Sequence, residues 1–228
     1  MKDAAPLVVI AGYGDGLGAA LAERFAVQGF RVVGLCRARG PKRGPATIIP
    51  ADLTDAADTA RAWQEVCLQS IPQVVIHNAA ELVTGPFLEQ TPAAFRQAWD
   101  AAVLSAVHVA RLAFAPMIAA GGGAFLVSGA TASIRGGAGF APFAAAKFAL
   151  RGLTQSLARE FQPQGIHVVH VLLDGIIWSE RSRQRRPDLS AAECLDPAAI
   201  AEVYYGLCRQ SPSAWTHEID LRPRNERF

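Results

Sequence analysis

Phe143 and Lys147 are the residues in this sequence whose types and spacing come closest to a catalytic device. Residues four positions apart lie one turn apart on the same face of a helix. An ammonium beside a tyrosine hydroxyl would lower the pKa of the phenol and prepare it to exchange a proton with an alcohol or carbonyl oxygen. Here the aromatic residue is phenylalanine, which has no proton to give. The pair therefore leaves two readings open, an enzyme that uses another acid or a protein that only binds its ligand.

Alternating apolar and helical stretches indicate the elements that must position this pair. Strands are predicted at 7–11, 31–36, 47–49, 73–77, 124–128, 167–173 and 215–221, and helices at 17–29, 55–70, 92–120, 141–162 and 197–210. Strands that are apolar throughout are typical of a parallel sheet covered by helices on both faces. The alternation predicts a three-layer α/β fold with a doubly wound parallel sheet, that is, a Rossmann fold.

The chain is expected to form one domain over residues 1–228. Hydrophobic residues make up 51% of the sequence and charged residues 18%, which is typical of a compact globular protein with a large core. The breaks between the predicted elements are short, and no internal repeat is visible. The stretch 180–195 is long and polar enough to be a substrate lid.

Composition argues against several classes of protein. The net charge of +2 does not favour a nucleic-acid partner. The four cysteines are scattered without a CxxC pair, and His167 and His170 lie in a predicted strand, so no metal site is expected. We find neither a signal-type segment nor ~18 consecutive apolar residues that would span a membrane. The sequence predicts a soluble, cytoplasmic protein.

A glycine-rich turn follows the first predicted strand and leads directly into a helix. Its sequence is Gly12-Tyr13-Gly14-Asp15-Gly16-Leu17-Gly18. Gly12 permits a tight turn, and Gly16 and Gly18 allow the backbone to approach a pyrophosphate at the helix N-terminus. The strand, turn and helix together favour a dinucleotide site. Its candidate residues in this segment are Gly12, Asp15, Gly16, Leu17 and Gly18.

The end of the second strand bears on which dinucleotide binds. A carboxylate at this point would hydrogen-bond a ribose 2′-hydroxyl and select NAD. The sequence has none there, and Arg37, Arg39, Lys42 and Arg43 follow instead. Because a guanidinium pairs well with a 2′-phosphate, NADP(H) is the preferred cofactor and NAD(H) the less favoured one. The alternative is that these residues form a solvated turn.

Several motifs together resemble the short-chain dehydrogenase/reductase family across nearly the whole chain. Besides the glycine turn, Asp52-Leu53 resembles the adenine-pocket pair, and His77-Asn78-Ala79-Ala80 is similar to the Asn-Asn-Ala-Gly segment beside the adenine ribose. The resemblance implies a nicotinamide cofactor and an oxidoreductase activity. It assigns cofactor contacts to Asp52, Leu53, Asn78, Ala79, Ala80, Lys147, Gly175 and Ile176.

The family's catalytic tetrad of Asn, Ser, Tyr and Lys is largely absent from this sequence. The resemblance places Phe143 at the Tyr position and Lys147 at the Lys position, so that the motif reads FxxxK. Ala130 stands at the Ser position, and Ala102 stands at the Asn position. Because a positioned general acid contributes about 10²–10⁴ in rate, ordinary carbonyl reduction through this tetrad should be crippled. Lys147 is expected to hold the nicotinamide ribose.

Two residues are candidates to replace the lost groups. Thr131 follows Ala130 directly, so its hydroxyl could hold a substrate oxygen or bond the local backbone. Asp174 stands where the family has Pro before Gly, at a loop that the resemblance places beside the nicotinamide. Its carboxylate could titrate beside Lys147 or form an ion pair. Both alternatives stay open for each residue.

The sequence thus predicts an NADP(H)-dependent oxidoreductase with an altered active site, acting on a small carbonyl, alcohol or activated alkene. A catalytically silent NADP(H)-binding or partner-subunit module is the main alternative, and a non-redox lyase or isomerase is a third. The resemblance also implies a homodimer or homotetramer through the alanine-rich helices 92–120 and 141–162, and a strictly monomeric mass in light scattering would contradict this. Ala144, Ala145, Phe148 and Gly152 are the candidates for an apolar outer face.

Overall fold

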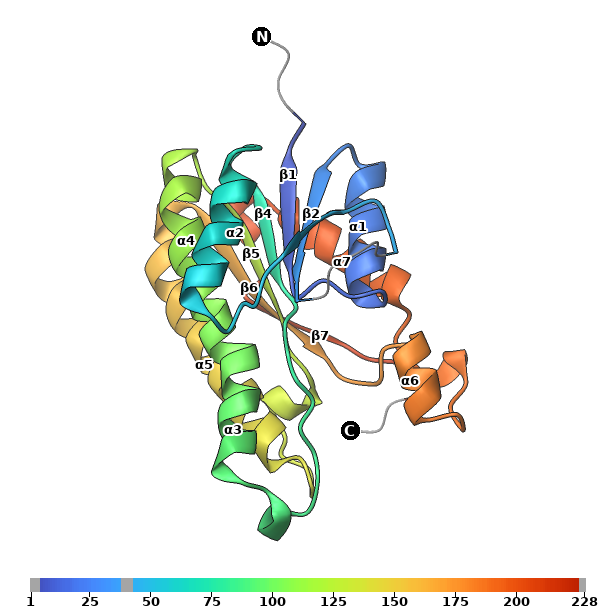
Figure 1. Cartoon of the computed structure of the whole chain (residues 1–228). Helices are drawn as coiled ribbons and strands as arrows, with labels where there is room; N and C mark the ends of the chain where they lie inside the picture. Colours follow the sequence, from blue (N-terminus) through green and yellow to red (C-terminus); the bar gives the residue numbers. More distant parts are fainter. Residues whose placement is uncertain (1–4, 38–42, 226–228) are drawn as a thin grey trace.

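Seven parallel strands form one central sheet within residues 5–37 and 43–225, which the computed structural model describes (Figure 1). Their order is β3-β2-β1-β4-β5-β6-β7, and all neighbouring pairs are parallel. The strands are β1 (Leu7–Ala11), β2 (Arg31–Cys36), β3 (Thr47–Pro50), β4 (Val74–His77), β5 (Gly123–Ser128), β6 (Ile166–Leu173) and β7 (Glu218–Leu221). The chain reverses its winding between β1 and β4, which is where doubly wound sheets bind ligands. The predicted fold class is confirmed.

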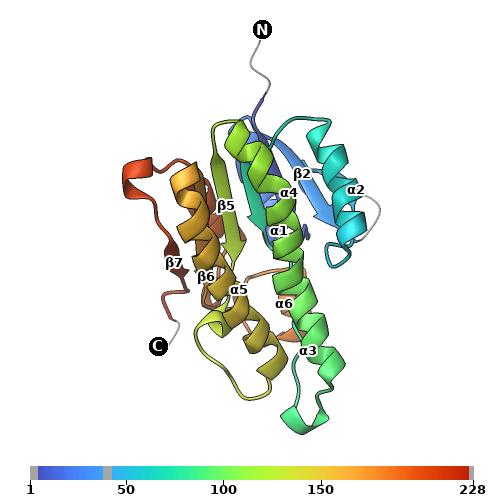
Figure 2. The same cartoon turned by 90° about the vertical axis from the view of Figure 1, so that its left-hand side faces the viewer.

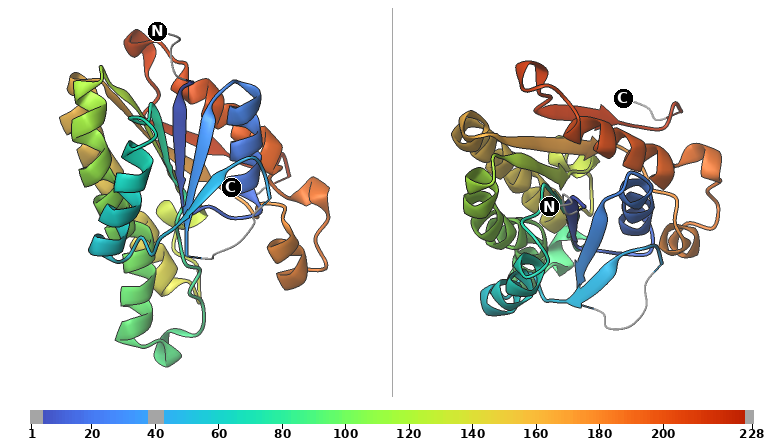
Figure 3. Two further views of the ribbon diagram at one scale, coloured as in Figure 1. Left: turned by 45° about the horizontal axis from the view of Figure 1, so that its top comes forward. Right: turned by 90° about the horizontal axis from the view of Figure 1, so that it is seen from above.

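Helices cover both faces of the sheet, as Figures 2 and 3 show. One face is covered by α2 (Ala56–Cys67), α4 (Ser105–Ala119) and α5 (Ala141–Phe161), and the other by α1 (Leu17–Val27) and α7 (Pro197–Cys208). The remaining helices are α3 (Pro92–Trp99) and α6 (Glu180–Arg185). A π-helical segment, Asp100–Leu104, joins α3 to α4. Short 3₁₀ turns lie at Phe87–Glu89, Thr131–Ser133, Gln162–Gln164, Ala191–Glu193 and Pro212–Ala214.

The strands are buried on both faces because their side chains alternate between two hydrophobic cores. In β1, Leu7 and Val9 pack with α2, α4 and α5, whereas Val8 and Ile10 pack with α1 and α7. Each of these four side chains is fully buried. Burial of a Val, Leu or Ile side chain stabilises the fold by about 1.5–3 kcal/mol, so apolar residues at every position of the strand are favoured.

The long central helix agrees with the helix predicted over 92–120. Residues Pro92–Ala119 form a continuous helical run of 28 residues, and its most apolar 18-residue stretch has a mean hydropathy of 1.7, so the run is long and apolar enough by composition to span a membrane. The expectation of no ~18 consecutive apolar residues still holds, because Arg96, Asp100 and Arg111 interrupt the run. The π-helical segment joins α3 and α4 without a break. Half of the run's most apolar stretch is buried inside the protein, as in the core helix of a globular domain.

Candidate functional site

A cleft of about 630 Å³ opens at the carboxyl ends of β1, β2, β3 and β4. It is lined by seven of the predicted cofactor residues, namely Gly12, Arg37, Asp52, Leu53, Asn78, Ala79 and Ala80. The sequence analysis missed other lining residues, among them Arg96, Gln97, Asp100, Ser105 and Arg181. In Figure 1, α3 and α6 both extend beyond the ends of the strands. Arg96 of α3 and Arg181 of α6 line the cleft.

Gly12 is required by the geometry of the glycine turn. Its φ of +87° lies in the left-handed region, and a Cβ at this position would lie 2.4 Å from the main-chain nitrogen of Ala79. The side-chain amide of Asn78 donates to the carbonyl oxygen of Gly12 at 3.2 Å. By contrast, a Cβ on Gly14 would meet no atom within 4 Å. The turn is therefore packed tightly against the segment after β4 at Gly12 and open at Gly14.

The N-terminus of α1 offers main-chain donors to an anion. Gly16 caps the helix without a side-chain hydrogen bond, and the first turn contains no acidic residue. The Leu17 side chain is buried, and its main-chain N–H belongs to the first turn of the helix, where N–H groups have no partner within the helix. The Asp15 carboxylate accepts a hydrogen bond from the main-chain nitrogen of Arg43 at 3.0 Å. These features fit a pyrophosphate at the helix N-terminus, where backbone N–H groups and the helix dipole favour negative charge.

Tyr13 connects the glycine turn to the segment that follows β2. A Cβ on Gly34 would lie 2.6 Å from the Tyr13 ring, so the ring occupies the space that a side chain on β2 would need. The Tyr13 hydroxyl donates to the carbonyl oxygen of Arg43. Burial, followed by the nearby Asp15 carboxylate, raises the pKa of Tyr13 to about 12, so the hydroxyl keeps its proton. Tyr13 thus has a structural role that the sequence pattern did not reveal.

Arg37 lines the cleft, and its guanidinium also lies near the carboxylate of Glu81. Its Nη2 lies 3.8 Å from Oε2 of Glu81, and its side chain is 72% exposed. Glu81 also accepts a hydrogen bond from the side chain of Gln97 at 2.8 Å. Two other predicted basic residues, Arg39 and Lys42, lie outside the described residues. An exposed arginine at the end of β2 fits a 2′-phosphate, although Glu81 competes for it.

The Asp52-Leu53 pair is fixed by local hydrogen bonds. The Asp52 carboxylate accepts from the main-chain nitrogen of Thr54 at 3.0 Å and from its hydroxyl at 2.7 Å. The Leu53 carbonyl accepts from Nδ1 of His108 at 3.0 Å. These bonds hold the turn after β3 at the wall of the cleft, where the resemblance expected an adenine pocket.

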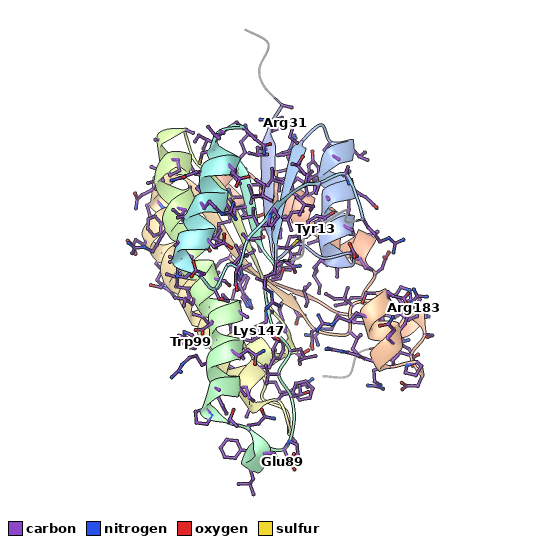
Figure 4. All side chains as sticks on the ribbon, viewed as in Figure 1. Tyr13, Arg31, Glu89, Trp99, Lys147 and Arg183 are labelled. Carbon is purple, nitrogen blue, oxygen red and sulfur yellow. The ribbon has the colours of Figure 1, made fainter. Side chains whose placement is uncertain are left out.

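Lys147, labelled in Figure 4, is a buried lysine on α5. Its side chain is only 3% exposed, and its Nζ donates to the carbonyl oxygen of Ser128 at 2.8 Å. The ring centroid of Phe143 lies 5.8 Å from Nζ, so the predicted pair does share one helix face. Burial lowers the pKa of Lys147 to about 8, because desolvation penalises the ammonium. Lys147 does not line the cleft described above, and its ammonium is held beside the end of β5.

Thr131 and Asp174 come together, with Arg222 as a third member. The Thr131 hydroxyl donates to Oδ1 of Asp174 at 2.5 Å, and Nη2 of Arg222 lies 3.3 Å from Oδ2 of Asp174. Asp174 is 4% exposed. Of the two alternatives for Asp174, the structure shows an ion pair, and its partner is Arg222. The sequence analysis missed Arg222, because only the pairing of Leu173 with Leu221 in neighbouring strands brings the two segments together.

The hydroxyl groups near Ala130 have local partners. Ser133 accepts a hydrogen bond from the main-chain nitrogen of Ala130 at 3.1 Å, and the Ser128 hydroxyl lies 2.8 Å from that of Tyr204. Ala102 is buried within the π-helical segment. The alanines at the Ser and Asn positions are therefore part of a packed region, and Thr131 carries the hydroxyl that is hydrogen-bonded to an acid.

A model of the short chain dehydrogenases matches residues 6–189 of this chain. The chain belongs to the short-chain dehydrogenase family. A short-chain dehydrogenase of known structure from Rhodopseudomonas palustris is 33% identical, with a TM-score of 0.79, and the alignment covers 96% of this chain and 98% of that one. A sequence relative, named probable galactose dehydrogenase, from Rhizobium meliloti (strain 1021) is 29% identical over 225 residues, which cover 88% of this chain and 85% of the relative.

A more distant neighbour shares the fold of this short-chain dehydrogenase. The alcohol dehydrogenase of the archaeon Thermococcus sibiricus, solved with 5-hydroxy-NADP, is 17% identical with a TM-score of 0.82, and the alignment covers 98% of both chains. The seven-stranded parallel sheet and its helices therefore agree with solved members of the fold.

The loop after β6 links the short-chain dehydrogenase's cleft to the predicted lid. Gly175 has a φ of +153°, and a Cβ there would lie 2.8 Å from Pro223. The Ile176 carbonyl accepts from the nitrogen of Leu195 at 2.8 Å, so the two ends of the lid are joined. Within 180–195 the chain forms α6 and a 3₁₀ turn, and Arg181 of α6 lines the cleft. Gly175, Ile176, Asp15, Gly16, Leu17 and Gly18 lie outside the residues that line it.

The described part of the chain contains no cluster of three or more His, Cys, Asp or Glu side chains that could hold a metal ion. The four cysteines form no disulfide bond with one another. The candidate site consists of the residues that line the cleft, and Lys147 and the Thr131–Asp174–Arg222 group lie outside that lining.

Proposed function

We propose that the protein is an NADP(H)-dependent oxidoreductase with an altered active site, acting on a small carbonyl, alcohol or activated alkene. One observation carries the proposal: seven residues assigned to the cofactor from sequence line a single cleft of about 630 Å³. Clefts of this size at the switch point of a parallel sheet are typical sites for dinucleotides. The named relatives, a galactose and an alcohol dehydrogenase, support the small-molecule substrate class.

The residues that line the cleft, together with the start of α1 and Lys147 outside its lining, have proposed shares in holding the cofactor. The main-chain N–H groups at the start of α1 would hold the pyrophosphate, Asp52 and Asn78 the adenosine half, and Arg37 the 2′-phosphate. The Lys147 ammonium would donate to the nicotinamide ribose. A bound nicotinamide supplies or accepts the hydride, and the chain's own residues orient the reactants and handle the proton.

Thr131 is the proposed partner of the substrate oxygen. Its proton already points to Asp174, so the oxygen can accept a hydrogen bond from a substrate hydroxyl. In alcohol oxidation the substrate proton would pass to Thr131 as Thr131 passes its own to Asp174. The Arg222 guanidinium lies 3.3 Å from the other carboxylate oxygen of Asp174.

Substitution of Asp174 tests this role. Asp174→Asn should lower turnover about 10²-fold or more, because the amide does not accept the proton. Removal of the buried charge beside Arg222 should also lower the free energy of unfolding by about 1–3 kcal/mol. Thr131→Val is the matched comparison: it removes the hydroxyl and keeps the ion pair, so turnover should fall, and the loss of stability should be smaller than in Asp174→Asn because the carboxylate keeps Arg222. Unchanged turnover in Asp174→Asn would exclude the carboxylate from the chemistry.

Arg37→Ala tests the coenzyme preference. The affinity for NADPH should fall about tenfold or more, whereas that for NADH should not change, because only NADPH carries the phosphate that Arg37 would bind. Calorimetric titration of both coenzymes measures this. Arg135→Ala, an exposed arginine in the loop after β5, is the control and should leave both affinities unchanged. Equal binding of NADH and NADPH by the unaltered protein would contradict the preference.

The silent-module alternative has a specific observation in its favour, since Phe143, Ala130 and Ala102 carry no titratable group. Tight NADPH binding without turnover on any carbonyl, alcohol or alkene substrate would support it.

The cytoplasmic location stays a prediction, as does the homodimer or homotetramer. Of the residues expected on the outer face, Phe148 is 45% exposed, but Ala144 is buried in the core.

A further inference from the structure

His77 is a fully buried histidine with one ring nitrogen in use. It is the last residue of β4 and has no exposed surface. Its Nε2 lies 2.8 Å from the hydroxyl oxygen of Ser105 on α4. Its Nδ1 is buried and has no hydrogen-bond partner among residues 5–37 and 43–225. An unpartnered buried nitrogen costs about 1–3 kcal/mol of desolvation, so its presence calls for a physical reason.

The neighbours of Ser105 decide which nitrogen of His77 carries the proton. The Ser105 hydroxyl donates to the carbonyl oxygen of Ala101 at 2.7 Å. A hydroxyl has one proton to donate, so toward His77 it acts as the acceptor and Nε2 carries the hydrogen. Burial, and then the charge of Lys147, lowers the pKa of His77 to about 3, so the ring is neutral. Nδ1 is therefore a buried acceptor with a free lone pair.

The Lys147 ammonium lies on the face of the sheet that α4 and α5 cover, and it has more N–H donors than its one hydrogen bond to Ser128 uses. The Cα of His77 pairs in register with that of Val127, and the next residue, Ser128, accepts the hydrogen bond from Nζ of Lys147. An ammonium has three N–H donors, and this bond uses one of them. His170 pairs with Val127 from the opposite side. It is the other histidine that the charge of Lys147 reaches, and its pKa is lowered to about 4, chiefly by burial.

The π-helical segment gives Ser105 its position. Ala101 lies within Asp100–Leu104, and Ser105 follows this segment directly. Both residues line the cleft. Single π-helical turns inside α-helices are frequent at functional sites, because the wider turn re-aims the side chains around it. The same segment holds Ala102, where the family's catalytic Asn is missing.

We propose that His77 and Ser105 are positioning residues for Lys147. The Lys147 ammonium donates toward Nδ1 of His77 through one water, and Ser105 fixes the tautomer that leaves Nδ1 free to accept. A hydrogen bond to the charged form offsets part of the burial cost and keeps Lys147 protonated near neutral pH. The contact needs no bound nucleotide, so its failure would be separate from failure of the proposed function.

The composition of the chain makes this contact measurable. The sequence contains three lysines, Lys2, Lys42 and Lys147, and five histidines. In protein labelled with ¹⁵N at lysine and histidine, NMR should show His77 neutral, protonated at Nε2, with Nδ1 shifted as a hydrogen-bonded acceptor. Lys147→Met should move the Nδ1 resonance toward that of an unbonded nitrogen. The proposal would be overturned if His77 were protonated at Nδ1, or if Lys147→Met left the Nδ1 resonance unchanged. Neither measurement requires a substitution of His77 itself.

Substitutions at His77 and Ser105 provide the second measurement. His77→Asn keeps an acceptor near the position of Nδ1, whereas His77→Gln places its amide nearer Nε2. We expect the pKa of Lys147, titrated by NMR, to change little in His77→Asn and to fall by about one or more in His77→Gln. Ser105→Ala should also lower it, and Ser105→Thr should restore it. If His170→Gln moves this pKa and the His77 and Ser105 variants do not, the positioning role belongs to His170.

Discussion

Gly12→Ala should abolish NADPH binding and lower the free energy of unfolding by about 2–5 kcal/mol. Two costs add at this position. A left-handed φ of +87° costs a residue with a Cβ about 1–2 kcal/mol. The Cβ would also lie 2.4 Å from the nitrogen of Ala79, and overpacking against atoms that cannot give way costs about 1–3 kcal/mol. Relief of this clash would move the glycine turn out of the cleft, so NADPH binding should be lost together with stability. Urea denaturation and NADPH titration measure the two effects.

Gly14→Ala is the matched control for Gly12→Ala. Gly14 lies in the same turn and lines the same cleft, but its Cβ would meet no atom within 4 Å and its φ is not in the left-handed region. We expect a change in the free energy of unfolding below about 1 kcal/mol, the usual size of a Gly→Ala effect at a compatible site. Equal losses of stability in both variants would show that the turn is not packed as described.

Lys147→Met should separate binding from stability, because the two are expected to change in opposite directions. The affinity for NADPH should fall about 10–100-fold, the value of one charge-assisted hydrogen bond. The free energy of unfolding should rise by about 1–3 kcal/mol at pH 7, since an apolar side chain of similar length avoids the cost of burying an ammonium. A residue kept only for packing would not show this opposition, which is typical of functional sites.

The pH dependence gives a second signature of Lys147. Burial lowers its pKa in the folded protein to about 8, from an ordinary lysine value of 10.5. Between these values the unfolded chain binds the additional proton, so this group makes stability rise with pH from about 8 toward 10. NADPH affinity should fall over the same range as the charged donor is lost. Both trends should be absent in Lys147→Met. Stability that does not depend on pH in this window in the unaltered protein would contradict the assigned pKa.

Local sequence patterns were sufficient for the strands and the glycine turn. β1 and β2 have the predicted bounds, because a fully buried parallel strand requires apolar residues at every position. The helical turn of α6 was not predicted, since a six-residue polar helix has no apolar face to recognise. The π-helical segment was also hidden, because its residues have the same apolar character as the helices on either side.

The parts of the site that depend on distant residues could not be predicted. Asp174 and Arg222 are far apart in the chain and meet only through the pairing of β6 with β7. The partners of His77 depend on the way α4 lies over β4. Arg181 was read as part of a polar stretch, and only the direction of α6 brings it to the cleft. Sequence patterns identify which residues can do chemistry, whereas their partners follow from topology.

Tyr13 has a consequence for redesign of the coenzyme preference. Its ring requires glycine at position 34, and its hydroxyl holds the main chain at Arg43, which Asp15 also binds. The glycine turn and the segment after β2, which is proposed to distinguish NADPH from NADH, are thus held together by Tyr13 and Asp15. An acidic residue introduced at the end of β2 alone would stand on a backbone that Tyr13 holds in its present position. Exchange of coenzymes in this chain should therefore require coordinated replacement of Tyr13, Gly34 and Arg37, and single substitutions should weaken one coenzyme without improving the other.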